Sequence, residues 1–391
     1  MKTTRIQYGT FLVVFLGMIF GFGPFLTDMY LPAFPQLQAH FGTDARTVQM
    51  SLSSCMLGLA FGQVFWGPLS DRYGRRGVTM VSLLMFMISC VGCILAPGMA
   101  FLIAMRFLQG LGGSGGIVLS RSIAADLYSG RELARVMALV GAVNGIAPVT
   151  APVVGGLLTD SAGWRGIFAV LLAIGFVLFL GSLHFRESLP AERRSDSGLS
   201  SILDNFRQLL GNRRYVWCIL QYGFLHGMFF SYLSSSPFIV QDHYGFSATG
   251  YSIFFALNAT TVGVASVLSM KFRTPARCTM VSSAALLGLS LAVAAVLGTG
   301  GPVWAYAACT LLQVFCCGLC FASTPAMTLD LGRGNAGAAA ALLGVSTYLV
   351  GFIVTPLVGV GDSMLATGIV YVVSSALALY FALRLDRTHS S

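Results

Sequence analysis

The stretch "GPLSDRYGRRG", residues Gly67–Gly77, concentrates charge in a chain that otherwise carries little of it. Asp71, Arg72, Arg75 and Arg76 all lie in it, whereas charged residues make up only 9% of the 391-residue chain and hydrophobic residues make up 56%. Long uncharged runs flank the stretch on both sides. A short basic turn between two apolar runs is typical of a loop on the cytoplasmic side of a membrane.

Hydrophobic runs of roughly 20 residues, long enough to cross a bilayer as helices, recur along the whole chain. The mean hydropathy of +0.79 also lies outside the range of soluble domains. The sequence therefore predicts an all-α polytopic membrane protein with about twelve transmembrane helices. The predicted spans are 8–37, 45–69, 77–96, 98–124, 136–158, 163–184, 214–240, 247–271, 277–298, 301–326, 335–359 and 363–385.

The positions of the 23 Lys and Arg residues predict the orientation of these spans. If the N-terminus lies in the cytoplasm, cytoplasmic segments hold all of them, Arg121 included, except Arg46, Arg106 and Arg165. This bias follows the positive-inside rule, so both termini are expected in the cytoplasm. It also accounts for the net charge of +9 without a nucleic-acid partner.

The longest polar segment, residues 185–214, divides the runs into six plus six. We predict an N-terminal six-helix bundle over 1–184, a cytoplasmic linker over 185–213 and a C-terminal six-helix bundle over 214–391. Two such bundles, related by pseudo-symmetry, place a binding site between them near the membrane midplane. Glycines in "GLGGSGG" (Gly110–Gly116) and the pair Gly58 and Gly62 predict close helix–helix packing.

No metal site or cofactor is expected. The nine cysteines include two groups within apolar runs, neither accompanied by His or carboxylate side chains, so small buried hydrophobic residues are their expected role. The glycines of Gly110–Gly116 formally match a dinucleotide fingerprint, but they lie inside a predicted membrane helix and not at a strand-to-helix turn. With no phosphate loop or nucleophile–base pair either, the chain is not expected to be an enzyme.

The opening stretch resembles the loop motif of the major facilitator superfamily, G-x-L-(a/s)-D-r-x-G-r-(r/k), almost position for position. "LIAMRFLQGLGGSG" (Leu102–Gly115), with Arg106, resembles the fourth-helix motif of drug:proton antiporters in that family. "TDMYLPAFP" (Thr27–Pro35) resembles the end of the first helix in the bicyclomycin and chloramphenicol resistance (Bcr/CflA-like) branch. "APVVGG" resembles the fifth-helix antiporter motif, whose residues here are Gly145, Pro148, Pro152, Gly155 and Gly156.

This resemblance implies a cytoplasmic gate built on the loop. Its residues are Gly67, Asp71, Arg72, Gly74, Arg75 and Arg76. Asp71 is expected to contact the positive dipole end of the eleventh helix, at 335–341, and the loop arginines to pair with Asp126 or Glu132. Pro148 and Pro152 are expected to bend the fifth helix.

Asp28 and Arg106 are the ionisable residues well inside the spans of the first half. An uncompensated charge in hydrocarbon costs at least roughly 2.5–3.5 kcal/mol, which makes both functional candidates. Both are expected on the order of 12–15 Å below the outer surface, so that they meet directly or through water. Asp28 is then expected to carry the coupled proton, and Arg106 to adjust the proton affinity of Asp28. The alternative is a fixed ion pair between the two residues that holds the bundle together.

Further polar residues within the spans are candidates for a substrate cavity, with helix-to-helix hydrogen bonding as the alternative role. These are Tyr30, Asn144, Gln221, His226 and Asn258. His226 is a second candidate for proton coupling.

Together these features predict a proton-coupled multidrug efflux transporter in the inner membrane of a bacterium, which exports small amphiphilic, drug-like compounds by alternating access. Its expected partners are the substrate, protons and the lipid bilayer, and the chain is expected to act as a monomer. The alternative is a carrier of the same fold for a natural metabolite such as a sugar or nucleoside.

Overall fold

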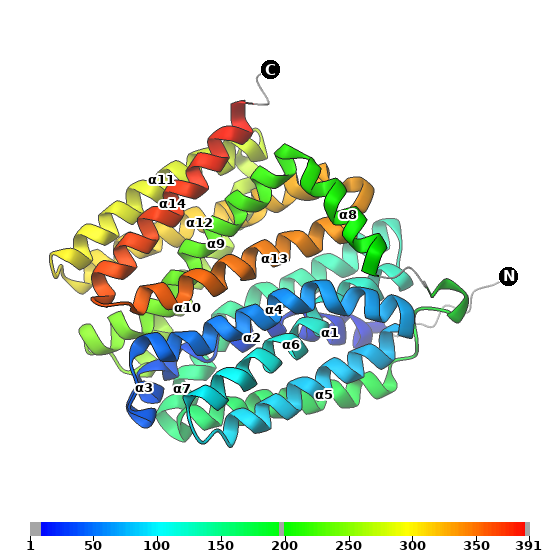
Figure 1. The fold of residues 1–391 in the computed structure, drawn as a ribbon, viewed down its shortest axis with the longest axis horizontal. Helices are drawn as coiled ribbons and strands as arrows, with labels where there is room; N and C mark the ends of the chain where they lie inside the picture. The colour runs from blue at the N-terminus through cyan, green and yellow to red at the C-terminus, as the bar shows by residue number, and fades with distance from the viewer. Residues whose placement is uncertain (1–8, 195–198, 388–391) are drawn as a thin grey trace.

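A computed structural model describes residues 9–194 and 199–387, and every regular element in these ranges is helical (Figure 1). The first half of the molecule contains α1 (Gly9–Phe20), α2 (Phe22–Asp28), η1 (Leu31–Ala33), α3 (Phe34–Phe41), α4 (Ala45–Tyr73), α5 (Arg75–Ile94), α6 (Met99–Leu127) and α7 (Gly130–His184). The connecting segment contains η2 (Ala191–Arg193) and α8 (Leu199–Gly211). The second half contains α9 (Arg213–Phe238), η3 (Ile239–His243), α10 (Ala248–Leu268), η4 (Ser269–Lys271), α11 (Pro275–Gly298), α12 (Val303–Leu331), η5 (Arg333–Asn335), α13 (Ala336–Val354), η6 (Thr355–Gly359) and α14 (Ser363–Arg387).

Twelve segments of this structure can cross a membrane. Ten helical stretches are long and apolar enough by themselves among the described residues. One of them, α7, is 55 residues long and is two helices joined at Gly163, where the backbone turns with φ of 70°. The serine-rich α9 is more polar but 26 residues long, so counting α7 twice and adding α9 gives the predicted number.

The first membrane segment is broken, which the single predicted run over 8–37 did not anticipate. Helix α1 ends before Gly21, α2 ends at Asp28, and η1 and α3 complete the crossing. Pro32 and Pro35 explain the second break, because each occupies one of the first two positions of a new helical element, where its missing amide donor costs least.

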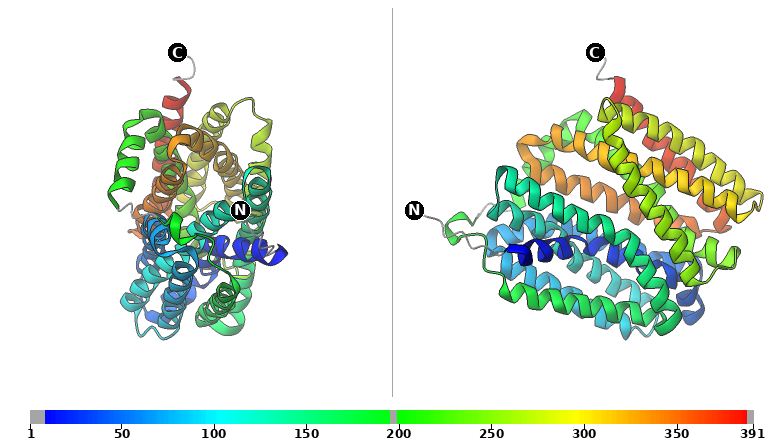
Figure 2. Two further views of the ribbon diagram at one scale, coloured as in Figure 1. Left: turned by 90° about the vertical axis from the view of Figure 1, so that its right-hand side faces the viewer. Right: turned by 180° about the vertical axis from the view of Figure 1, so that it is seen from behind.

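The two halves lie side by side, each a bundle of helices (Figures 1 and 2). Within the first half, glycines bring α4 and α6 into backbone contact. A Cβ on Gly110 would lie 2.0 Å from the carbonyl oxygen of Cys55, and one on Gly58 would lie 2.2 Å from that of Phe107. The predicted close packing of these glycines is therefore confirmed.

Hydrogen bonds between the halves gather at one end of the molecule. We call the end that carries the Gly67–Gly77 loop and the segment 185–212 the linker end, and the end that carries Gly163 the opposite end. Every hydrogen bond between the halves in the described ranges lies toward the opposite end, donor first: Gln49 to Ser234, Ser53 to Phe352, Gln241 to Pro32, Thr249 to Asp160 and Thr355 to Met56. The described structure is thus closed at the opposite end.

Candidate functional site

The charged loop is a tight turn between α4 and α5. Helix α4 ends at Tyr73, and Gly74 then adopts φ of 95°, a conformation that other residues rarely take. A side chain at Gly74 would also meet the carboxylate of Glu187, because a Cβ there would lie 2.5 Å from Oε2. Gly74 therefore allows both the tight turn and the close approach of Glu187, which follows α7.

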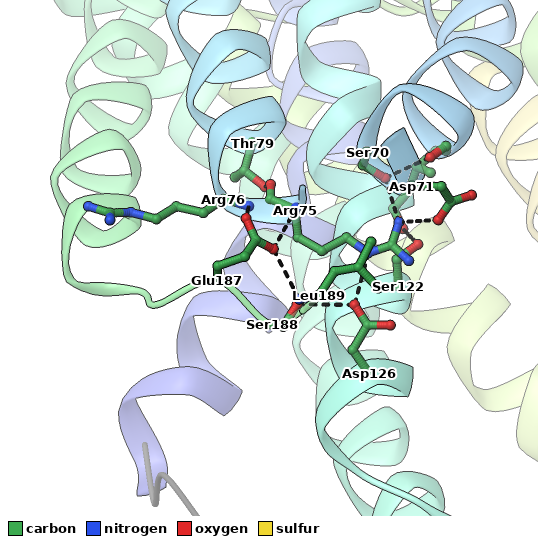
Figure 3. Close-up of polar contacts among 12 residues, drawn as sticks. Ser70, Asp71, Arg75, Arg76, Thr79, Ser122, Asp126, Glu187, Ser188 and Leu189 are labelled. Carbon is green, nitrogen blue, oxygen red and sulfur yellow. Dashed lines mark hydrogen bonds and ion pairs between the residues drawn. The ribbon is translucent and has the colours of Figure 1, made fainter. Parts of the chain in front are cut away.

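Arg75 is the centre of the polar contacts in this loop (Figure 3). Its Nη1 lies 2.6 Å from Oδ1 of Asp71 and donates to Oγ of Ser70, while its Nε donates to Oδ2 of Asp126 at 2.9 Å. Ser188 donates to the same oxygen of Asp126 at 3.1 Å. The structure thus brings together three predicted residues, and of the two acids considered as partners it is Asp126 that pairs with the loop.

Glu187 completes the cluster, and the sequence analysis did not assign it a role. Its carboxylate accepts from the backbone amides of Arg75 at 2.7 Å and Arg76 at 3.1 Å, at the start of α5. A carboxylate there satisfies free amides and complements the positive end of the helix dipole. Arg76 donates to the carbonyl of Leu183 at 2.8 Å, near the end of α7. The loop therefore ties α4, α5, α6 and α7 together.

The expected contact between Asp71 and the start of α13 is not formed in this structure. Asp71 is half exposed and pairs with Arg75, and no hydrogen bond or ion pair joins it to 335–341 among the described residues. Glu132 likewise forms no ion pair there, and Arg72 lies over the ring of Tyr73. The described hydrogen bonds between the halves all lie toward the opposite end, so a contact of Asp71 with α13 would require the linker ends of the two halves to move closer together.

Replacing Asp71 with Asn tests that interpretation. In this conformation Asp71 is half exposed, and the buried Arg75 keeps its second partner, Asp126, so we expect a stability loss of about 1 kcal/mol or less. Turnover should fall much more, since neutral Asn interacts less with a helix dipole when the linker end closes. Thermal melting and transport by Asp71→Asn, with Asp126→Asn as the less exposed comparison, measure the two effects. Wild-type transport at equal expression would reduce the role of Asp71 to the loop alone.

Arg106 and Asp28 are both buried but do not form an ion pair in the described structure. The guanidinium of Arg106 lies 4.4 Å above the ring centre of Tyr30, donates to the carbonyl of Leu26 at 2.9 Å and also bonds to Gln109. Gln109 lies one turn further along the same helix and was not considered as a partner. The expectation that the two charges meet directly is therefore not met here.

Asp28 faces the second half of the molecule instead. Its only described hydrogen bond comes from Oγ1 of Thr27 at 2.7 Å, and it is 6% exposed. It lies within electrostatic range of Tyr232, Tyr251 and Tyr348, all in the second half. A carboxylate without a described cationic partner therefore sits close to the interface between the bundles.

Most of the predicted cavity residues instead bond within the protein. Tyr30 bonds Ser51, with 2.9 Å between hydroxyl oxygens. Gln221 donates to Ser283 at 3.2 Å and accepts from Thr324 at 2.9 Å, and so joins helices α9, α11 and α12. The amide of Asn258 donates to the carbonyl of Phe254, one turn back in the same helix. The side chain of Asn144 lies outside the described residues.

His226 belongs to an aromatic cluster. Its Nδ1 lies 2.9 Å from the carbonyl oxygen of Tyr222, and its ring stacks on Phe321 at 4.5 Å between centres. The ring of Tyr222 lies 4.2 Å from the imidazole. His226 is thus packed among rings near the interface, with no acidic partner described.

The fifth-helix motif lies where α7 meets both halves. A Cβ on Gly155 would lie 2.1 Å from the carbonyl oxygen of Met29, and one on Gly156 would lie 2.1 Å from Oγ of Ser252 in the second half. Gly145 has open space around it. The backbone stays helical through the two prolines; the only non-helical dihedrals in α7 are those of Gly163.

The main residue that the sequence analysis misplaced is Arg121. It was counted among the cytoplasmic segments, but it precedes the last residue of α6, Leu127, by six positions, or about 9 Å along the helix. The helix continues to Leu127 because "RSIAADL", about two turns long, contains no glycine or proline that would end it. Arg121 is thus a charge within a membrane-length helix.

Within the described residues, no group of three or more His, Cys, Asp or Glu side chains is arranged to hold a metal ion. The candidate site consists of the charged loop at the linker end, a buried acid and arginine in the first half, and aromatic residues of the second half within electrostatic range of Asp28.

Comparison with known proteins identifies the family of this chain. The family model described as Major Facilitator Superfamily matches residues 10–356. The uncharacterized MFS-type transporter YdgK of Bacillus subtilis is 36% identical, over 90% of this chain and 89% of its own. A bicyclomycin resistance protein homolog of Haemophilus influenzae is 29% identical over 96% and 97%. The chloramphenicol resistance protein of Pseudomonas aeruginosa is 31% identical over 63% and 57%.

Solved structures share the fold at low sequence identity. A bacterial homolog of the human lysosomal transporter Spinster superposes with a TM-score of 0.73 at 17% identity, covering 97% of this chain and 98% of its own. The D-xylose-proton symporter superposes with a TM-score of 0.68 at 15% identity, covering 95% and 96%. On the family match and its whole-length relatives, the chain belongs to the major facilitator superfamily of membrane transporters.

Proposed function

We propose that this transporter is a proton-coupled exporter of small amphiphilic, drug-like compounds. The observation that carries the proposal is the similarity, along nearly the whole chain, to a protein named for bicyclomycin resistance, together with the partial match to a chloramphenicol resistance protein. The resemblance of the fourth-helix and fifth-helix motifs to drug:proton antiporters supports the same conclusion.

The way the halves meet supports alternating access. The described hydrogen bonds between the halves lie toward the opposite end and none lies at the linker end, so a substrate enters from the linker end. When the halves rock, the contacts at the opposite end break and Asp71 closes on α13. The charged loop keeps α4 to α7 together during this movement, because Arg75, Asp126 and Glu187 link their ends.

Asp28 is the proposed proton carrier. It is buried near the interface and lacks a described cation, and an uncompensated charge in such a place is unfavourable. Proton binding removes that charge. A conformational change that encloses Asp28 therefore favours proton uptake, and one that opens the site to water favours proton release. Arg106 positions the surrounding backbone and ring through Leu26 and Tyr30, and does not itself release a proton.

The linker end is proposed to face the cytoplasm, because the basic loops lie there. The transporter then operates as a monomer in a bacterial inner membrane and exports toward the opposite end.

A proton-flux assay in inverted vesicles tests this function. Vesicles from an efflux-deficient host are acidified inside, and chloramphenicol or bicyclomycin is added at equal expression of wild type and Asp28→Asn. We expect drug addition to dissipate the pH gradient with wild type only, and wild type to raise drug resistance of intact cells. If neither drug nor a wider panel does so, while a sugar or nucleoside moves protons, the protein is a metabolite carrier instead.

A further inference from the structure

Arg121 is a cation within a membrane-length helix that nevertheless reaches solvent. It lies six residues before the end of α6, and its side chain is exposed. The guanidinium carbon lies 4.9 Å from the ring centre of Phe20, at the end of α1. Arg121 therefore lies beside the break in the first membrane segment, and its side chain is accessible to solvent.

No acid neutralises Arg121 in the described part of the chain. The nearest acid along α6, Asp126, is already engaged by Arg75 and Ser188. Arg121 also differs from a membrane-surface anchor, because it lies more than a turn inside its helix, whereas Arg131 and Arg135 lie in the first two turns of α7. A charge held at this depth without a partner is a functional candidate by default.

Aromatic side chains of the second half face this cation. Tyr222 on α9 and Tyr348 on α13 lie within electrostatic range of Arg121. Both are partly exposed, and neither hydroxyl has a hydrogen-bond partner among the described residues. Phe321 on α12 lies next to Tyr222, at 6.2 Å between ring centres. A cation of the first half thus lies within electrostatic range of rings and free hydroxyls of the second half.

We propose that Arg121, Tyr222, Phe321 and Tyr348 form the substrate site that is open at the linker end, and that it takes flat aromatic compounds bearing a carboxylate or another strong hydrogen-bond acceptor. A guanidinium binds carboxylates by charge-assisted hydrogen bonds, and rings bind rings by stacking or edge contacts. Lipophilic cations bind poorly there, because Arg121 repels them. This inference rests on the proposed function, since an exporter takes up its substrate from this end.

Three compounds with one ring system separate the charge contribution from the ring contribution. 2-Naphthoate is anionic, 2-naphthamide is neutral with an acceptor, and 2-naphthylmethylammonium is cationic. Their dissociation constants for the purified full-length protein are measured by calorimetry, without any proton gradient. The variants are Arg121→Gln, Arg121→Lys and Tyr348→Leu. Arg131→Gln is the control for net charge, because Arg131 is exposed on α7 and outside the site.

Wild type is expected to bind naphthoate most tightly and the ammonium compound least tightly. Arg121→Gln should weaken naphthoate by about tenfold or more, the loss of a charge-assisted hydrogen bond. The same change should leave the ammonium compound unchanged or tighter. Arg121→Lys should keep the order of the three compounds, Tyr348→Leu should weaken all three alike, and Arg131→Gln should change none of them.

Equal binding of the three compounds to wild type, or full naphthoate affinity in folded Arg121→Gln, would overturn this inference. The wild-type order is decisive even if Arg121→Gln fails to fold, as thermal melting will show. Because binding needs no gradient, a failure here leaves proton-coupled export standing. Conversely, the expected order in a protein that gives neither resistance nor drug–proton exchange would overturn the proposed function alone.

Discussion

Asp28→Asn should abolish proton-driven export while the protein stays folded. The carboxylate makes one described hydrogen bond, from Thr27, and Asn can accept the same bond. Removing one partner of a buried ion pair is strongly destabilising because the other charge is left unpaired. No described cation pairs with Asp28, so Asp28→Asn leaves no such unpaired charge behind. Asn cannot exchange a proton near neutral pH, so the coupled step is lost.

Two measurements on one purified sample check this prediction. Ligand-induced proton release in weakly buffered solution should be present in wild type and absent in Asp28→Asn. Thermal melting should be nearly unchanged, and substrate exchange without net proton movement should persist. Asp204→Asn on the exposed face of α8 is the matched control. A stable Asp28→Asn protein that still releases protons would remove Asp28 from the mechanism and leave His226 as the next candidate.

Gly110→Leu is expected to prevent folding, and Gly110→Ala to lower stability clearly. The first added carbon would lie 2.0 Å from the carbonyl oxygen of Cys55, on the backbone of α4, which cannot move as a flexible side chain does. Inserting one extra methylene into a packed core already costs typically about 1–3 kcal/mol. Here the two helices must separate along their length, and leucine forces a larger separation than alanine.

Gly288→Ala is the comparison for this second prediction. Gly288 also lies within a helix, α11, but a Cβ there has no atom within 4 Å. Replacing glycine by alanine in a helix interior favours the helix by about 1 kcal/mol, so Gly288→Ala should melt at or above the wild-type temperature. Membrane yield and melting temperature of both variants give the result. A Gly110→Ala protein that melts with wild type would show that α4 and α6 are not in backbone contact.

The helices and their number were predictable because each bilayer crossing needs a long apolar run, whatever its neighbours are. The loop residues were predictable for a similar reason, since the turn needs glycine and the membrane surface attracts arginine. The close packing at Gly110 followed from the absence of a side chain. Each of these features depends on residues that are near one another in the sequence, so it can be predicted without knowing the fold.

The partners of the buried charges were not predictable in the same way. Arg106 bonds to Gln109 and Leu26 and not to Asp28, because side-chain direction on α6, and not depth alone, decides which groups meet. Glu187 reaches the amides of α5 across more than a hundred residues of chain. Arg121 was misplaced because a few polar residues near the end of a helix resemble a loop in sequence.

The turn at Gly163 has a mechanical consequence for the first half. Helix α7 reverses direction there within a single residue, and the amide of Trp164 donates to Gln36 of α3 at 2.7 Å. A connection this short couples the ends of the two arms, so a displacement of the first arm at the Gly156 contact is passed on to the second arm through Gly163.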